Sequence, residues 1–298
     1  VLSGYSPALI DADRETVASM LGKAGYFTAF IGKWHLGWNW AMDEENEVDF
    51  SKPVGGSPND NGFDYAYGHC GSLDMAPYVY VENGKPTAIP DTVTGSQSEY
   101  GWWRNGPTSP DFSHEDVTPN FFRRSIELVK ERARHDQPFF LYLPLPSPHT
   151  PILPTAEWVG KSGINPYADF AMMVDDYLGS LLDAVTTSGI ESNTLVFFTT
   201  DNGCSPAAKF DVMLEKGHNP SYLFRGHKAD IYEGGHRVPF IVKWPGRIQA
   251  GTRSDMTICS TDLMATFAEI TGFTLPDNAA EDSYSLLPIL KGEATEPI

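Results

Sequence analysis

The sequence predicts an α/β fold with a mostly parallel central sheet and helices on both of its faces. Apolar stretches typical of strands alternate along the chain with amphipathic stretches typical of helices. Their spacing leaves room for helical crossovers, which parallel strands require. With 298 residues and 41% hydrophobic composition, the chain is long enough to bury a core as one large domain or two small ones.

The first unit of this pattern is a helix followed by a strand. Asp13 or Thr16 can cap a helix that continues to about Lys23, and Gly25 stops it before a strand at 27–31. The later predicted elements are helices at about 118–134, 167–188 and 262–271 and strands at 139–145, 194–200 and 239–243.

Between about 38 and 117 the chain shows no sustained period. Glycine, proline, asparagine, serine and aromatic residues are frequent there, which predicts long loops with a small hairpin at 78–86. Loops of this length in a compact enzyme usually shape a pocket.

Composition limits the partners that this chain can bind. The 39 acidic and 21 basic residues give a net charge of −18, which disfavours nucleic acid and anionic membranes. No apolar run is long enough to span a membrane, and no signal peptide is visible. Three cysteines without a CxxC pair indicate neither a disulfide scaffold nor a zinc-thiolate site.

Polar side chains follow several of the predicted strands. Lys33 and His35 follow the first strand, His149 lies in a Pro-His-Thr-Pro turn, and Asp201 and Asn202 precede a glycine. Each has an ordinary alternative as a surface turn, since Asp-Asn-Gly forms turns on any surface. Because the carboxyl ends of parallel strands meet at one edge, we expect these side chains to converge.

A cation-rich stretch completes the set. It runs from Phe224 to Phe240 and contains Lys228. Surface ion pairs are the commoner fate of such a run, and an oxyanion site is the alternative.

Four motifs together resemble the type I sulfatases, the formylglycine-dependent arylsulfatase-like family of the alkaline phosphatase superfamily. They are Gly-Lys-Trp-His-Leu-Gly at 32–37, Ser-Pro-His-Thr-Pro at 147–151, Thr-Asp-Asn-Gly at 200–203 and Lys-Ala-Asp-Ile-Tyr-Glu-Gly-Gly-His-Arg-Val-Pro at 228–239. Their order and spacing fit over nearly the whole chain, although no single motif is specific.

The resemblance implies a role for each strand-end residue. Asp201 and Asn202 would hold part of a Ca²⁺ site, with Mg²⁺ as the alternative, since both supply hard oxygen ligands. Lys33 and Lys228 would bind sulfate oxygens, and His149 would donate a proton to the leaving oxygen. The resemblance also makes His35 the base that expels sulfate from the covalent intermediate on the hydrated formylglycine.

Two expected parts of such a centre are missing from these residues. The family's first-strand aspartate pair and its C/S-x-P/A-x-R formylglycine motif are both absent. Cys204 begins a similar stretch that ends in Ala208 instead of arginine, so we interpret it as a loop. We therefore expect residues 1–298 to be a partial catalytic domain, truncated at both ends, with the small C-terminal sheet subdomain largely absent.

The leading hypothesis is hydrolysis of sulfate monoesters, small or glycan-borne, with Arg225, His227 and the 38–117 region selecting the sugar. Four tryptophans of that region either stack on sugar rings or pack the loops down: Trp38, Trp40, Trp102 and Trp103. The alternatives are a phosphate mono- or diester hydrolase of the same superfamily and a non-catalytic relative that binds sulfated glycans. The resemblance implies a secreted, periplasmic or lysosomal protein; the oligomeric state stays open, and this stretch alone is expected to be inactive.

Overall fold

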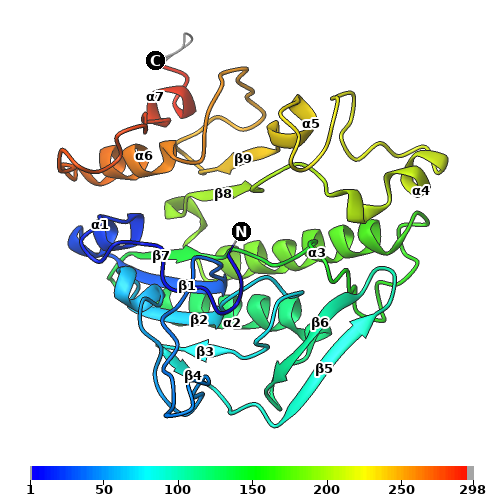
Figure 1. Ribbon diagram of the computed structural model, residues 1–298. Coiled ribbons are helices and arrows are strands. Elements are labelled where there is room, and N and C mark those ends of the chain that lie inside the picture. Colours follow the sequence, from blue (N-terminus) through cyan, green and yellow to red (C-terminus); the bar gives the residue numbers. More distant parts are fainter. Residues whose placement is uncertain (1, 294–298) are drawn as a thin grey trace.

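The computed structural model describes residues 2–293 as nine strands and seven helices around a mixed sheet (Figure 1). The strands are β1 (Phe27–Lys33), β2 (Tyr65–His69), β3 (Val81–Glu82), β4 (Lys85–Pro86), β5 (Thr92–Gln97), β6 (Trp102–Thr108), β7 (Phe139–Tyr142), β8 (Val196–Thr199) and β9 (Phe240–Lys243). The helices are α1 (Val17–Lys23), α2 (Val117–Arg132), α3 (Pro166–Thr187), α4 (Phe210–Glu215), α5 (Glu233–His236), α6 (Asp262–Thr271) and α7 (Leu287–Leu290).

The predicted α/β class is confirmed, and its parallel part is the centre of the sheet. The five-stranded sheet has the order β4-β3-β2-β1-β7, in which β1 runs parallel to both β2 and β7. The pairs β2–β3 and β3–β4 are antiparallel. A second, two-stranded sheet joins β8 to β9, and within residues 2–293 it shares no strand pairing with the first.

Helices cover both faces of the larger sheet because side chains alternate along its strands. On one face, Phe139 and Leu141 of β7 pack with Val129 of α2 and with α3. On the other face, Phe140 packs with α1 and α6. Phe267 of α6 also contacts Phe197 of β8 at 5.7 Å between ring centroids, so this helix joins the two sheets through side chains.

The cap of α1 and the bounds of α6 agree with the sequence prediction. Thr16, one of the two expected caps, accepts a hydrogen bond from the Ser19 amide at the start of α1, which satisfies a donor that the helix leaves free. The last predicted helix is α6, with the predicted bounds 262–271.

Two expectations about the strands are wrong. The region predicted as long loops with one hairpin contains that hairpin, β3–β4, but also β2 and the antiparallel pair β5–β6. Strand β2 lies inside the sheet, next to β1. Strand β9 pairs antiparallel with β8 instead of parallel.

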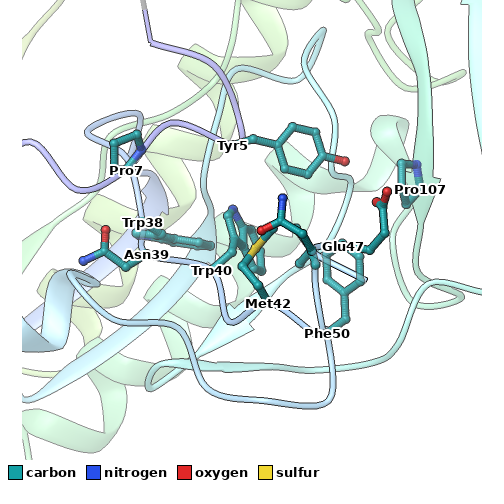
Figure 2. Close-up of a pocket in the computed structure, with 11 residues that line it drawn as sticks. Tyr5, Pro7, Trp38, Asn39, Trp40, Met42, Glu47, Phe50 and Pro107 are labelled. Carbon is teal, nitrogen blue, oxygen red and sulfur yellow. The ribbon is translucent and has the colours of Figure 1, made fainter. Parts of the chain in front are cut away.

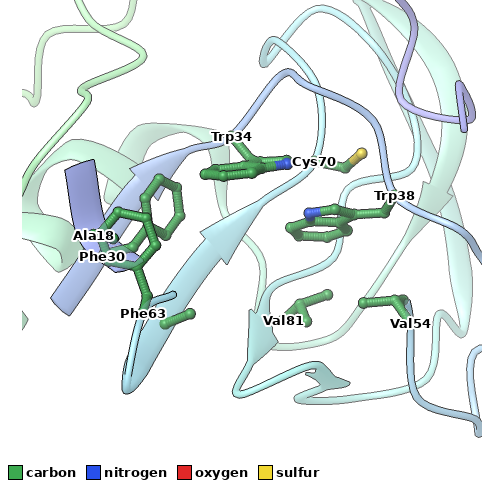
Figure 3. Close-up of a cluster of buried hydrophobic side chains, with 9 residues drawn as sticks. Ala18, Phe30, Trp34, Trp38, Val54, Phe63, Cys70 and Val81 are labelled. Atoms are coloured by element: carbon green, nitrogen blue, oxygen red, sulfur yellow. The ribbon is translucent and has the colours of Figure 1, made fainter. Parts of the chain in front are cut away.

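An aromatic cluster fills the space beneath the end of β1 (Figure 3). Phe30 and Trp38 are almost fully buried, and the Phe30 ring contacts Trp34 at 5.3 Å and Phe63 at 5.8 Å. Trp38 is therefore a core residue, which settles its role in favour of packing. The cluster gives the end of β1 a rigid support.

Candidate active site

The end of β1 is held against the segment after β7 by a glycine. A Cβ added to Gly32 would lie 2.2 Å from the carbonyl oxygen of Pro144, so only glycine allows this approach. The amide of Lys33 then donates to the same oxygen at 2.8 Å. This contact joins the strand that carries Lys33 to the segment that leads to His149.

A second glycine joins the loops that carry Asp201 and Lys228. A Cβ on Gly203 would lie 1.8 Å from the Gly234 carbonyl oxygen, and the Gly203 amide donates to Gly235 at 2.9 Å. The amide of Lys228 donates to the Cys204 carbonyl, also at 2.9 Å. The antiparallel pairing of Thr199 with Phe240 places the end of β8 beside the start of β9, so the two loops meet although the strands are not parallel.

Four of the predicted residues act on one another electrostatically. We call Lys33, His149, Asp201 and Lys228 the strand-end cluster. Burial lowers the pKa of Lys33, while the charge of Asp201 raises it and that of Lys228 lowers it. Burial also lowers the pKa of His149, and Lys228 and Lys33 lower it further.

His149 has a defined tautomer. Its Nδ1 lies 2.7 Å from the Thr150 carbonyl oxygen and 3.2 Å from Ser72 Oγ. A carbonyl only accepts, so Nδ1 carries the proton and donates it to Thr150. Nε2 is left as the nitrogen that can exchange a proton with a substrate.

His35 has the opposite tautomer. Its Nε2 lies 3.0 Å from the Leu2 carbonyl oxygen and therefore donates to it, which leaves Nδ1 as the acceptor. The backbone of His35 has a positive φ of 51°, and its amide donates to the Cys70 carbonyl at 2.6 Å. A tight turn thus presents the imidazole beside the chain's first residues.

Two polar residues of this region have no signal in the sequence. Ser72 contacts His149, and Asp74 raises the pKa of both Lys33 and His149. Asp74 is buried and pairs with Arg104 at 2.6 Å. Both follow β2, the strand that the sequence analysis missed, so nothing marked them as residues at a strand end.

Arg225 and His227 contact their own loop. The guanidinium of Arg225 lies 3.8 Å from the centroid of the Tyr232 ring. The imidazole Nδ1 of His227 lies 3.0 Å from the Lys228 carbonyl oxygen and 3.4 Å from Asp230 Oδ2. Both residues are near Lys228 in the sequence, but their side chains contact residues of their own loop.

Asp201 and Asn202 fit a hard divalent cation in donor type but not in number. Both follow β8, and they offer carboxylate and amide oxygens, whereas Ca²⁺ takes six to eight oxygen ligands. Among residues 2–293, no group of three or more His, Cys, Asp or Glu side chains is arranged to hold a metal ion. The pair is thus part of a ligand set.

Two of the three cysteines of the described chain, Cys70 and Cys204, are poorly suited to act as a nucleophile. All three are free. Burial raises the pKa of Cys204, and burial raises that of Cys70 to about 12, which disfavours the reactive thiolate. Cys259 is exposed, and hydrogen bonds with Thr261 lower the pKa of its thiol.

The sulfatase family model matches residues 2–273, and the chain belongs to this family. The N-acetylgalactosamine-6-O-sulfatase of Bacteroides thetaiotaomicron is 28% identical, over 98% of this chain and 63% of that protein. Human N-acetylgalactosamine-6-sulfatase is 30% identical, over 94% of this chain and 49% of that protein. Human arylsulfatase A is 30% identical, over all of this chain and 55% of that protein.

Solved structures agree with this assignment. A Bacteroides thetaiotaomicron structure, described under the metabolism of multiple glycosaminoglycans, superposes with a TM-score of 0.86 at 26% identity, over 100% of this chain and 68% of that one. The sulfatase PsFucS1 from Pseudoalteromonas sp. shares the fold, with a TM-score of 0.72 at 23% identity, over 99% and 59% of the two chains. The chain spans about half to 63% of the length of the curated relatives named above.

The relatives named above are sulfatases, which are sulfuric ester hydrolases. The family also implies a metal ion and a formylglycine residue in general terms. No helix among residues 2–293 is both long and apolar enough to cross a bilayer.

Proposed function

We propose that the complete protein hydrolyses sulfate monoesters of a carbohydrate through a formylglycine that lies outside these 298 residues. The gathering of two lysines, a histidine and an aspartate in the strand-end cluster is the observation that carries the proposal. Sulfate ester cleavage needs fixed cations that contact the sulfate oxygens and an acid that protonates the leaving oxygen. The cluster offers both kinds of group.

Lys33 and Lys228 would bind the sulfate oxygens. The charge of Lys228 lowers the pKa of Lys33, and the charges of both lysines lower the pKa of His149. This is expected for cations that are held close together. An anion bound between the two lysines removes this repulsion, which favours sulfate binding at the cluster. Asp201 offsets part of the positive charge at Lys33.

His149 would donate the proton to the departing oxygen from Nε2, since Thr150 occupies Nδ1. Its lowered pKa makes the protonated imidazole a stronger acid than an ordinary histidine. His35 would accept a proton at Nδ1 when sulfate is expelled, with Leu2 holding its Nε2–H. His149 would therefore act as an acid and His35 as a base.

Asp201 and Asn202 would contribute oxygen ligands to a Ca²⁺ ion, with Mg²⁺ as the alternative. Such an ion neutralises negative charge that develops on sulfate oxygens. We assign the remaining ligands to segments outside this chain.

The substrate we propose is a 6-sulfated N-acetylgalactosamine residue, on the basis of the names of the bacterial and mammalian relatives. Arg225 and His227 would help to select it from the loop that carries Lys228. The net charge of −18 disfavours nucleic acid as a partner. A secreted, periplasmic or lysosomal location follows from the family resemblance.

The test compares two aryl esters that differ only in the oxyanion. The complete, formylglycine-bearing protein should turn over 4-nitrophenyl sulfate much faster than 4-nitrophenyl phosphate. Lys228→Met should reduce kcat/KM for the sulfate about 10²–10³-fold, whereas Lys216→Met, at an exposed position on α4's C-terminal side, should not. Preference for the phosphate would support the phosphatase alternative, and sulfated-glycan binding without turnover would support the non-catalytic one.

A further inference from the structure

A cavity of about 570 Å³ opens between the N-terminal segment and the loop after β1 (Figure 2). We call it the aromatic pocket; its walls include Tyr5, Trp40, Phe50, Asn39, Asn46 and Glu47. None of the strand-end cluster residues lines it. Its size lies within the range of about 300–1,000 Å³ that is usual for ligand sites.

Two of the aromatic walls of this pocket, Trp40 and Phe50, are held in place by packing, whereas Tyr5 is exposed at its edge. The Trp40 ring contacts Trp38 at 5.5 Å and Phe50 at 5.4 Å between centroids, and Trp38 is almost fully buried in the core. Trp40 Nε1 donates to the Gly4 carbonyl oxygen at 2.9 Å. The polar edge of the indole is therefore occupied, and a preformed aromatic surface costs little ordering entropy when a ligand binds.

The polar groups at the rim select against anions. Glu47 is exposed, and its charge adds to burial in raising the pKa of the Tyr5 phenol. Asn39 and Asn46 supply amides, and no lysine, arginine or histidine is among the described residues that line the pocket. In a chain with a net charge of −18, this lining repels sulfated or carboxylated sugars.

The pocket is close to the cluster along the chain. Trp40 follows Lys33 of the cluster by seven residues and His35 by five, so its Cα atom lies at most about 25 Å from that of Lys33 and about 18 Å from that of His35. Tyr5 follows Leu2 by three residues, a span of at most about 11 Å, and the Leu2 carbonyl contacts His35. A glycan with its sulfate at the cluster thus has neighbouring sugars within reach of the pocket.

We propose that the aromatic pocket binds an uncharged sugar residue of the same glycan that carries the sulfate ester. Apolar ring faces suit the stacking of a sugar on Tyr5 and Trp40, and the amides and the Glu47 carboxylate suit its hydroxyl groups. The inference rests on the proposed function, because it assigns the glycan that reaches the cluster. It makes the enzyme favour sulfated residues within an oligosaccharide over the free sulfated monosaccharide.

The test uses the complete, formylglycine-bearing protein with two substrates. One is N-acetylgalactosamine-6-sulfate, and the other is a trisaccharide in which this residue is linked to two uncharged, unsulfated hexoses. Tyr5→Ala should raise KM for the trisaccharide about threefold to tenfold with kcat unchanged, and should leave the monosaccharide unaffected. Tyr284→Ala, an exposed tyrosine that does not line the pocket, is the matched control and should change neither.

Glu47→Lys provides a gain-of-function arm. It should lower KM for a trisaccharide that carries an additional sulfate on the second sugar, relative to the uncharged trisaccharide. Equal changes in KM for the monosaccharide and the trisaccharide in Tyr5→Ala, or no change in either, would overturn the inference. Concentration-dependent self-association that Tyr5→Ala abolishes without any effect on KM would also overturn it, in favour of a second copy of the chain.

Failure of the proposed function gives a different result. Wild-type protein would then release sulfate from neither substrate. Binding at the pocket can then still be tested with the unsulfated disaccharide of the two hexoses. It is titrated into wild-type and Tyr5→Ala protein, and binding is followed by saturation-transfer NMR. Binding that is lost in the variant supports the inference, and no binding to the wild type contradicts it.

Discussion

Acidification should destabilise this protein through two buried histidines. His69 ends β2 opposite Lys33, and burial together with the Lys33 charge lowers its pKa to about 3. Burial lowers the pKa of His114 to about 4. In the unfolded chain both titrate near 6.5, so below that pH the unfolded state binds more protons and the free energy of unfolding falls.

The size of this effect follows from the two pKa shifts. Each histidine contributes a slope of about 1.4 kcal/mol per pH unit between its two pKa values. From pH 6 to pH 4 the pair removes roughly 5 kcal/mol, a large part of the typical stability of about 5–15 kcal/mol. The loss begins as the pH falls below about 6.5 and ends for each histidine near its folded pKa.

The assay is urea unfolding at pH 7.5, 6, 5 and 4, followed by tryptophan fluorescence. His69→Phe keeps a ring stacked on Phe121, which lies 5.7 Å away, and should reduce the slope of unfolding free energy against pH by about 1.4 kcal/mol per unit. His218→Phe, at an exposed position, serves as the control. The reasoning is refuted when the His69 variant keeps the wild-type slope, or when the control reduces the slope as much.

Three further outcomes are expected. Asp201→Asn removes a charge that raises the pKa of Lys33, so the alkaline limb of the kcat/KM profile of the complete protein should move to lower pH; an unmoved limb would contradict the coupling. Phe30→Ala empties a fully buried position between Trp34 and Phe63 and should cost about 3–5 kcal/mol in urea unfolding, whereas a loss under about 1 kcal/mol would mean that this cluster is not tightly packed. Residues 1–298 alone should not turn over 4-nitrophenyl sulfate, because no C/S-x-P/A-x-R motif is present; robust turnover by the purified chain would show that another group acts as the nucleophile.

The helices α1, α2, α3 and α6 and most strands could be predicted because their signals are local, whereas the short helices α4, α5 and α7 were not predicted. Thr16, the apolar period of α2 and the continuous apolar run of β8 all lie within single elements. Strand β2 was missed because it is five residues long, contains a glycine and is flanked by turn-forming residues. Its place beside β1 depends on tertiary contacts, which short-range sequence patterns do not encode.

The candidate site shows the same division. Lys33, His149, Asp201 and Lys228 could be proposed as site residues because each stands in a recognisable motif near a strand or loop of the sheet. The argument from parallel strands was wrong for β9, yet Lys228 still meets the others because an antiparallel partner begins where β8 ends. Ser72 and Asp74 were missed since their importance arises only from contacts with residues far away in sequence.

The central claim is that the strand-end cluster binds and cleaves a carbohydrate sulfate ester. The most direct measurement is the release of inorganic sulfate from N-acetylgalactosamine-6-sulfate by the complete, formylglycine-bearing protein and its Lys33→Met variant. The account predicts steady release by the wild type and a kcat/KM about 10²–10³-fold lower for the variant. No release by the wild type, or equal release by the variant, would contradict it.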